Sequence, residues 1–150
     1  MSQGKIQLNL IFTATLDLVS EGDRIFVSHA EWMRESHPRE GANALLSYRV
    51  AKGPEHSNPL DPSSATTSNT MYVITEVYET QAGVDNHWKL GMETWKDFFA
   101  MVAWAGRCKV TMLHGTPVVH SLVESLHDSQ LNSHGFIRQQ QPSQLRGCLV

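Results

Sequence analysis

A regular alternation of apolar and polar residues predicts a strand at residues 71–78, MYVITEVY. Successive side chains of a strand point to opposite faces, so every second residue shares a face. One face holds Tyr72, Ile74, Glu76 and Tyr78, and the other holds Met71, Val73, Thr75 and Val77. The first face therefore places a carboxyl group and two phenols among apolar neighbours, whereas the second face is largely apolar.

Three further stretches have the pattern of strands. Residues 5–15 alternate in the same way, and residues 44–51 and 109–113 form two shorter runs. The last run could extend by a residue or two at each end. Pro117 lacks a backbone N–H group and indicates that this strand closes at an edge or in a turn. The chain thus offers four strands.

A first helix is predicted between the first two strands. Apolar residues recur at helical spacing from residues 24 to 36. Ser20 is the expected N-cap, because its hydroxyl can accept a bond from the first free backbone N–H groups. His37 precedes Pro38 and is expected to end the helix, since the residue before a proline is pushed out of the helical region.

Two helical segments are predicted after the third strand. A short one begins at Thr80 and carries His87. Residues 92–105 form the second long helix, with a wide apolar stripe that includes Trp95, and Gly106 ends it.

Two segments lack a clear periodic pattern. Residues 52–69 are rich in Pro, Ser, Asn and Thr and are long for a connection between strands. We favour a mobile surface loop there over a lid on a functional site. Beyond His120, residues 122–131 form one short amphipathic piece, and a Gln-rich segment follows. We expect a domain at residues 1–120 and a partly helical or disordered appendage at residues 121–150.

Composition excludes several classes of protein. The chain has 150 residues, of which 41% are apolar and 18% charged, and its net charge is −3. These values are ordinary for one globular domain and do not suggest a nucleic-acid or membrane partner. No apolar run reaches the roughly 20 residues that cross a bilayer, and the N-terminus lacks the pattern of a secretory signal. Cys108 and Cys148 form no disulfide framework or metal motif, so a cytoplasmic location is expected.

The order of the elements predicts the fold. Strand, helix, strand, strand, helix, strand is the split βαβ arrangement of an α+β, ferredoxin-like domain with a four-stranded antiparallel sheet. Two helices can cover only one face of that sheet. The other face carries Met71, Val73 and Val77, and its apolar surface suggests a homodimer formed sheet to sheet.

Glu76-Val77-Tyr78, followed nine residues after the tyrosine by His87, resembles the E-x-Y/W…H signature of antibiotic biosynthesis monooxygenase-like domains. The resemblance extends over residues 5–117, although the long segment before the third strand departs from the usual compact form. It implies a dimeric α+β barrel. It also implies a cofactor-independent oxidoreductase that acts on an aromatic, quinol or polyketide-like small molecule. No cofactor and no metal are expected.

The resemblance further implies a ligand pocket inside each protomer, between the sheet and its helices. His87 would be the general base or acid, Glu76 its orienting partner and Tyr78 a hydrogen-bond donor to the substrate. Further candidates for contact with the substrate are Tyr72, Trp95, Asn9 and His29. Haem is not expected, because residues 95–105 contain no histidine that could bind its iron.

The same residues allow other interpretations. Burying Glu76 without a partner is costly, so its carboxyl group should either bond a backbone amide or His87, or have a raised pKa. We favour a core or helix-surface position for His29, and His114 and His120 lack the further ligands of a metal site. Three functions stay open: a monooxygenase, a non-oxidative cyclase or isomerase, and a non-catalytic dimer that binds a small molecule or acts in a stress response.

Overall fold

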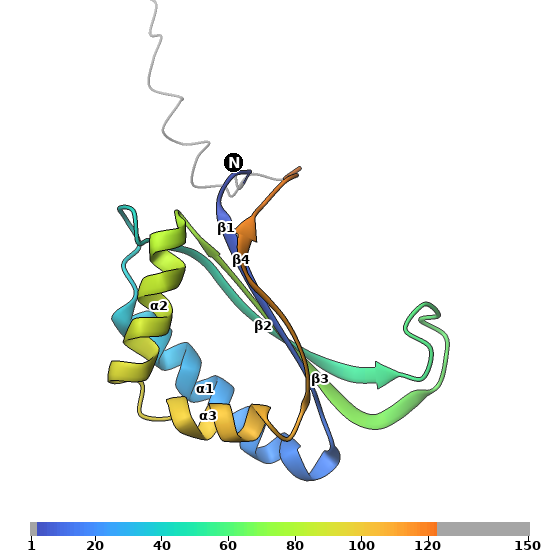
Figure 1. The fold of residues 1–150 in the computed structure, drawn as a ribbon. Coiled ribbons are helices and arrows are strands. Elements are labelled where there is room, and N and C mark those ends of the chain that lie inside the picture. Colours follow the sequence, from blue (N-terminus) through green and yellow to red (C-terminus); the bar gives the residue numbers. More distant parts are fainter. Residues whose placement is uncertain (1–2, 123–150) are drawn as a thin grey trace, which may run out of the picture. The chain divides into compact units, whose positions relative to one another are not determined.

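The computed structural model shows a four-stranded antiparallel sheet with helices on one of its faces (Figure 1). The structure describes residues 3–122, of which residues 3–120 belong to one compact unit. The strands are β1 (Ile6–Ala14), β2 (Leu45–His56), β3 (Thr66–Tyr78) and β4 (Lys109–Pro117), in the order β2-β3-β1-β4. This arrangement confirms the predicted ferredoxin-like α+β fold. The expected appendage lies almost wholly outside the described residues.

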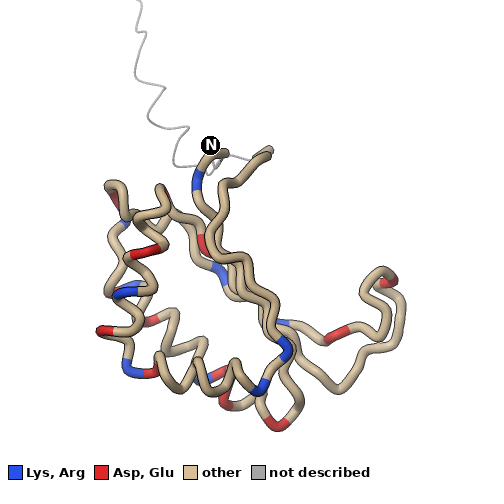
Figure 2. Tube along the Cα trace, in the orientation of Figure 1, with Lys and Arg blue, Asp and Glu red and all other residues tan. Residues whose placement is uncertain are grey.

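The helices are α1 (Val19–Ser36), α2 (Gln81–Thr94) and α3 (Phe98–Ala105), with a 3-10 turn η1 (Leu16–Leu18) before α1. All three helices cover the same face of the sheet (Figure 1). None of the helices between residues 3 and 122 is long and apolar enough to cross a membrane. Acidic and basic residues are interspersed along the trace without a long run of one sign (Figure 2), in keeping with the small net charge.

Alternation along the strands places one set of side chains under the helices. In β3 the buried residues are Tyr72, Ile74, Glu76 and Tyr78, and in β1 they are Leu8, Leu10, Phe12 and Ala14. The two sets lie next to each other, because Leu8 pairs with Glu76 and Phe12 with Tyr72. The predicted division of residues 71–78 into two faces is therefore confirmed.

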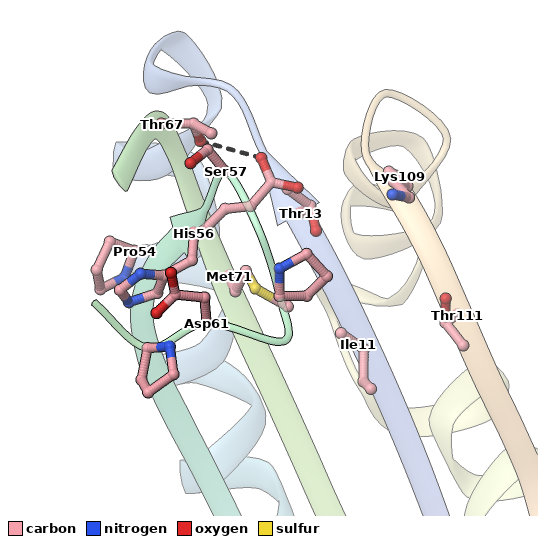
Figure 3. A pocket seen from close by; sticks show the side chains of 13 residues that line it. Ile11, Thr13, Pro54, His56, Ser57, Asp61, Thr67, Met71, Lys109 and Thr111 are labelled. Atoms are coloured by element: carbon pink, nitrogen blue, oxygen red, sulfur yellow. Dashed lines mark hydrogen bonds between the residues drawn. The ribbon is translucent and has the colours of Figure 1, made fainter. Parts of the chain in front are cut away.

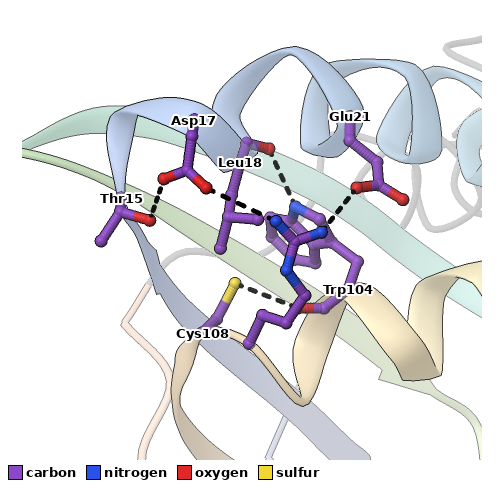
Figure 4. Close-up of polar contacts among 7 residues, drawn as sticks. Thr15, Asp17, Leu18, Glu21, Trp104 and Cys108 are labelled. Carbon is purple, nitrogen blue, oxygen red and sulfur yellow. Dashed lines mark hydrogen bonds and ion pairs between the residues drawn. The ribbon is translucent and has the colours of Figure 1, made fainter.

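The start of α1 differs from the prediction. Ser20 is not an N-cap, because the helix begins one residue earlier, directly after η1, and has no side-chain cap. Bonds from the end of α3 hold this start instead (Figure 4). The Trp104 indole N–H donates to the Leu18 carbonyl oxygen at 2.9 Å, and an arginine forms ion pairs with two carboxylates. The ion-paired residues are Arg107, Asp17 and Glu21.

The segment at residues 52–69 is a β-hairpin arm rather than a loop. β2 runs on into this segment and β3 begins within it, so the two strands project together beyond the rest of the sheet (Figure 1). Glu55 accepts hydrogen bonds across the arm from Thr67 at 3.0 Å and Asn69 at 2.9 Å. The arm borders a hollow of about 720 Å³ on the helix-free face (Figure 3). It is therefore not a lid over a site beneath the helices.

The predicted helix at residues 92–105 is in fact the end of α2 followed by the separate helix α3. α2 begins after its N-cap Thr80, as predicted. The chain turns between the helices because Asp97 accepts hydrogen bonds from Ser28 at 2.6 Å and from Arg24 at 2.8 Å, both on α1. A periodic apolar pattern carries no sign of such tertiary bonds.

One end of the core is an aromatic cluster packed between α1, α3 and the sheet. It consists of Phe12, Phe26, Tyr72 and Trp104, and its contacting rings have centroids 4.8 to 6.0 Å apart. Gly22 of α1 faces this cluster, and a Cβ atom there would lie 2.7 Å from the Trp104 ring. Close packing thus requires a glycine here, although glycine weakens a helix.

Gly22→Ala is expected to lower the free energy of unfolding by about 1–3 kcal/mol, because overpacking against the Trp104 ring outweighs the roughly 1 kcal/mol that alanine contributes to a helix. Denaturant unfolding measures the change. Gly106→Ala is the matched control, since its Cβ would have no contact below 3.5 Å and its φ is −63°. That substitution should leave stability unchanged or raise it. Equal effects of the two substitutions would contradict this account of the packing.

Candidate active site

A cavity of about 100 Å³ lies between the sheet and the helices. Side chains from all three helices and from β1, β3 and β4 line it, and most of them are apolar or aromatic. The lining includes His29, Trp32, Glu76, His87, Trp88 and Trp95. The larger hollow beside the hairpin arm lies on the other face of the sheet and shares none of these residues. The buried titratable groups His29, Glu76 and His87 line the smaller cavity.

Glu76 projects from β3 into this cavity and is completely buried. Its Oε2 atom accepts a hydrogen bond from the Tyr78 hydroxyl at 2.5 Å, whereas its Oε1 atom has no hydrogen-bond partner among the described residues. Burial raises the pKa of the carboxyl group to about 7, and the bond from Tyr78 offsets part of that rise. Near neutral pH, Glu76 can therefore both give and take a proton.

His87 on α2 places its Nδ1 atom 3.8 Å from Glu76 Oε2 and 3.1 Å from His37 Nε2. The first of these distances is too long for a hydrogen bond. Burial holds the pKa of His87 well below its usual value, and the neighbouring His29 and His37 lower it further. Glu76 and His87 therefore lie side by side as a weak acid and a neutral base rather than as an ion pair.

His29 reaches the same cavity from α1 and is also buried. Its Nδ1 atom lies 2.9 Å from the hydroxyl of Tyr48 on β2, and its ring centroid lies 4.7 Å from that of Trp95. Burial lowers the pKa of His29 to about 3, and His37 adds to the effect. Burial also raises the pKa of Tyr48. The pair of His29 and Tyr48 is therefore uncharged at neutral pH.

Two of the predicted site residues lie elsewhere. Tyr72 belongs to the aromatic cluster, where its hydroxyl donates to Asp23 at 2.8 Å. Asn9 lies on the helix-free face, where its amide donates to Thr75 at 3.1 Å. The structure therefore does not bring these two residues together with the other candidates at the cavity. Tyr72 shares the sheet face of Glu76 but lies four residues away from it along β3. The Asn9 side chain lies on the opposite face of the sheet.

Two residues of the site were not predicted. Tyr48 pairs with Glu76 across β2 and β3, so the strand register would have placed it on the buried face. His37 was predicted only as the end of the first helix, where the structure indeed finds it. Its contact with His87 joins positions 50 residues apart, and no local pattern in the sequence signals it.

The cluster has the residue types of a metal site. His29, Glu76 and His87 each offer one ligand atom, and these atoms lie within 4.8 Å of one another. The ligand atoms around one zinc ion lie about 3.4 Å apart. The atoms of this cluster are farther apart, so the three side chains would have to move closer to bind one ion. Glu76 and His29 also have hydrogen bonds to tyrosine hydroxyls. We therefore interpret the cluster as a set of acid and base groups and assign no metal to it.

The cavity reaches the surface between α3 and β4. Phe98, Met101 and Val102 of α3 and Met112 of β4 belong to its lining, and Val102 and Met112 are exposed. A ligand that enters here meets apolar side chains before it meets the polar groups at the other end. This arrangement suits an aromatic or otherwise apolar molecule with one or two polar atoms.

The fold and this cavity define a ferredoxin-like α+β protein with a buried carboxyl and imidazole cluster. The chain is similar to a dimeric ferredoxin-like protein from an uncultured marine organism, with 12% identity over 79% of this chain and 99% of that chain and a TM-score of 0.51. A proposed antibiotic biosynthesis monooxygenase from Deinococcus radiodurans has 13% identity over the same shares and a TM-score of 0.45. Comparisons with protein-family models and with curated proteins find no match. The first likeness shows the fold.

The raised pKa of Glu76 predicts how stability changes with pH. The folded pKa of about 7 lies above the ordinary value of 4.5, so the carboxyl group stabilises the folded state below pH 4.5, and this contribution is lost as the pH rises through 7. The side chain of the Glu76→Gln variant cannot ionise, so this variant does not lose stability in this way. The unfolding free energy of this variant minus that of the wild type should therefore rise by about 2–3 kcal/mol from about pH 5 to pH 8.

Denaturant unfolding across this pH range measures that difference. Both proteins contain the same histidines, so the contributions of these groups to the unfolding free energy largely cancel. Glu55→Gln is the control, because hydrogen bonds from Asn69 and Thr67 lower the pKa of Glu55 instead of raising it, so the corresponding difference should not rise with pH. A flat or falling difference for Glu76→Gln would show that the carboxyl group is already ionised in the folded protein.

Proposed function

We propose that this protein is a small enzyme that deprotonates and then oxygenates an aromatic, quinol or polyketide-like molecule, in the manner of antibiotic biosynthesis monooxygenase-like domains. The observation that carries the proposal is the buried carboxyl group of Glu76, which lines an apolar cavity beside the neutral His87. One of its oxygens has no hydrogen-bond partner within residues 3–122. A carboxyl group with a purely structural role would have both oxygens bonded. The sequence pattern formed by Glu76, Tyr78 and His87 supports the same function.

Each residue of the pattern has a separate role in this proposal. His87 is the general base that removes a proton from the substrate, and Glu76 gives or takes the second proton that the reaction moves. Tyr78 was predicted to donate to the substrate, but its hydroxyl donates to Glu76 and it does not line the cavity. We therefore assign Tyr78 to positioning Glu76. Trp95 and His29 form part of the wall against which a substrate ring would pack.

The proposed chemistry needs no electron carrier other than the substrate. Removal of a proton next to an aromatic ring leaves an electron-rich anion, which transfers one electron to O₂, and the two radicals combine as a peroxide anion. Protonation gives a hydroperoxide. For a substrate that reacts at a CH₂ group, loss of water then leaves a carbonyl group. One oxygen atom of O₂ stays in the product, and the other leaves as water with the two hydrogens of that carbon.

A non-oxidative cyclase or isomerase is the second candidate. The observation that favours it is the arrangement of proton donors and acceptors around one cavity, formed by Glu76, His87, His29 and Tyr48. Such groups can remove a proton at one position of a molecule and return it at another. Ligand sites usually exceed about 300 Å³, so a cavity of about 100 Å³ suits a small ring unless flexible side chains such as Met101 move aside.

Oxygen uptake with a panel of quinols and hydroxylated polycyclic aromatics tests the function. Glu76→Gln and His87→Phe should each lower kcat by about a hundredfold or more, because each removes a proton-transfer group. Tyr72→Phe removes a hydroxyl outside the cavity and is the matched control, with kcat unchanged. Treatment with a chelator should also leave turnover unchanged. A loss of turnover that added metal restores would reassign His29, Glu76 and His87 to a metal site.

The products separate the candidate functions. Turnover without oxygen uptake would identify the cyclase or isomerase and overturn the oxygenase. Binding of these aromatics without turnover of any of them would identify a non-catalytic binding protein and overturn both enzymes.

We also propose that two copies associate through the helix-free face of the sheet. Residues of this face that border the hollow in Figure 3 are Ile11, Thr13, Met71 and Thr111. Val73 lies between them on β3 and pairs with Ile11. A second copy would cover these side chains and the hollow. The likeness to a solved protein described as dimeric supports this association. No nucleic-acid or membrane partner is proposed.

Light scattering at micromolar concentration should give the mass of two chains. Val73→Glu is expected to give the mass of one chain, because a charge at the centre of the helix-free face would be buried without a partner. Val27→Glu places the same charge on α1, where the valine is exposed, and should leave the mass unchanged. A wild-type protein with the mass of one chain would overturn the dimer.

A further inference from the structure

Three side chains form a hydrogen-bonded row at one end of the cavity. His37 follows α1 in an extended conformation, which turns its ring toward α2. Its Nδ1 atom lies 2.9 Å from the Ser36 hydroxyl oxygen, and its Nε2 atom lies 3.1 Å from His87 Nδ1. Both histidines are buried, and Ser36 is half-buried. The row therefore runs from the end of α1 to the proposed base.

The donors in this row can be assigned from one bond. The Ser36 hydroxyl donates its single hydrogen to the Trp32 carbonyl oxygen at 2.6 Å, so toward His37 it can only accept. His37 Nδ1 must then carry a hydrogen. Burial and the charge of Arg39 lower the pKa of His37 to about 4, so the ring is neutral and its Nε2 atom is bare. A bare Nε2 atom accepts the hydrogen of His87 Nδ1.

We propose that His37 is a positioning residue, held by Ser36, that fixes His87 in the tautomer with its hydrogen on Nδ1 and thereby leaves His87 Nε2 bare as the base. The use of Nε2 as the base rests on the proposed function. The tautomer itself rests on the hydrogen bonds and on the neutral state of His37, and it holds whatever reaction the cavity supports.

Glu76 cannot take the place of His37. Its Oε2 atom lies 3.8 Å from the same His87 Nδ1 atom and already accepts the hydrogen of Tyr78. The other rings around His87 belong to His29, Trp32, Tyr78 and Trp88, and none of these four forms a hydrogen bond with the His87 nitrogens. His37 thus takes over the orienting role that the sequence suggested for Glu76. This leaves Glu76 free for proton exchange in the cavity.

The arrangement has a chemical consequence for the base. When His87 Nε2 takes a proton from the substrate, the ring becomes positively charged, and its Nδ1–H group then donates to His37 Nε2 as a charge-assisted bond, which is stronger than a neutral one. A base that is oriented and stabilised through its far nitrogen follows the same logic as the base of a catalytic triad. Here a second imidazole, backed by a serine, is the orienting group.

Two-bond ¹⁵N–¹H correlation spectra of the full chain test the assignment, because they show which ring nitrogen of a neutral histidine carries hydrogen. At neutral pH, His87 and His37 should both appear with the hydrogen on Nδ1. His37→Gln keeps an acceptor, its amide oxygen, near the position of Nε2 and should preserve the His87 pattern. His37→Phe keeps the ring but removes the acceptor and should shift His87 toward the other tautomer or a mixture. Hydrogen on His87 Nε2 in the wild type would overturn the proposal.

Ser36→Ala provides a second test that leaves both rings in place. It removes the acceptor of His37 Nδ1–H, so His37 and, through it, His87 should become tautomer mixtures, whereas Ser36→Thr keeps the hydroxyl and should keep both patterns. His56→Phe, on the hairpin arm, is the control for a histidine outside the cavity and should change neither ring. Unchanged spectra of His37 and His87 in Ser36→Ala would overturn the proposal that Ser36 and His37 fix the tautomer of His87.

Turnover separates this inference from the proposed function. If both hold, His37→Phe should lower kcat by about tenfold or more with little change in KM, and His37→Gln should restore most of it. The predicted spectra without any turnover would confirm the positioning of His87 and overturn the function. Equal turnover of His37→Phe and the wild type, with the His87 tautomer changed, would overturn the use of Nε2 as the base.

Discussion

The burial of one carboxyl group is the constraint on which the rest of this structure depends. Glu76 stands in the middle of an apolar sheet face, where the described part of the chain gives it a single side-chain hydrogen bond, from Tyr78, and leaves its other oxygen without a partner. An unsatisfied buried polar atom typically costs about 1–3 kcal/mol. The histidines around Glu76 add no compensating charge, because burial keeps them neutral. A cluster that costs stability and fills space poorly is typical of a functional site.

The same sheet face is divided into a packed end and a hollow end. At the packed end, Gly22 allows α1 to approach Trp104, and the rings of the aromatic cluster fill the space. At the hollow end, indole and imidazole rings contact one another and leave a cavity beside them. The change occurs within four residues of β3, between Tyr72 and Glu76. A rigid packed end can hold the sheet and α1 in place while ligands enter at the other end.

Local patterns in the sequence were sufficient for the fold and for part of the site. Alternation gave the faces of β1 and β3 correctly, since it depends only on strand geometry. Glu76 and His87 were predicted, but alternation could not tell that Tyr72 belongs to the packed end. The break before α3 and the contact of His37 with His87 depend on interactions between distant segments. Such contacts arise from the packing of α1 against α2 and α3, which no local pattern encodes.

The two indoles beside His29 have an optical consequence. Trp32 and Trp95 stack with their centroids 5.7 Å apart and their planes at 21°, and the His29 ring packs against both. Two chromophores held so closely in a fixed orientation couple their electronic transitions, which gives a characteristic near-ultraviolet circular dichroism. Since both rings line the cavity, any molecule that separates or tilts them alters that signal. The chain therefore contains its own spectroscopic reporter of occupancy, which needs neither a label nor knowledge of the reaction.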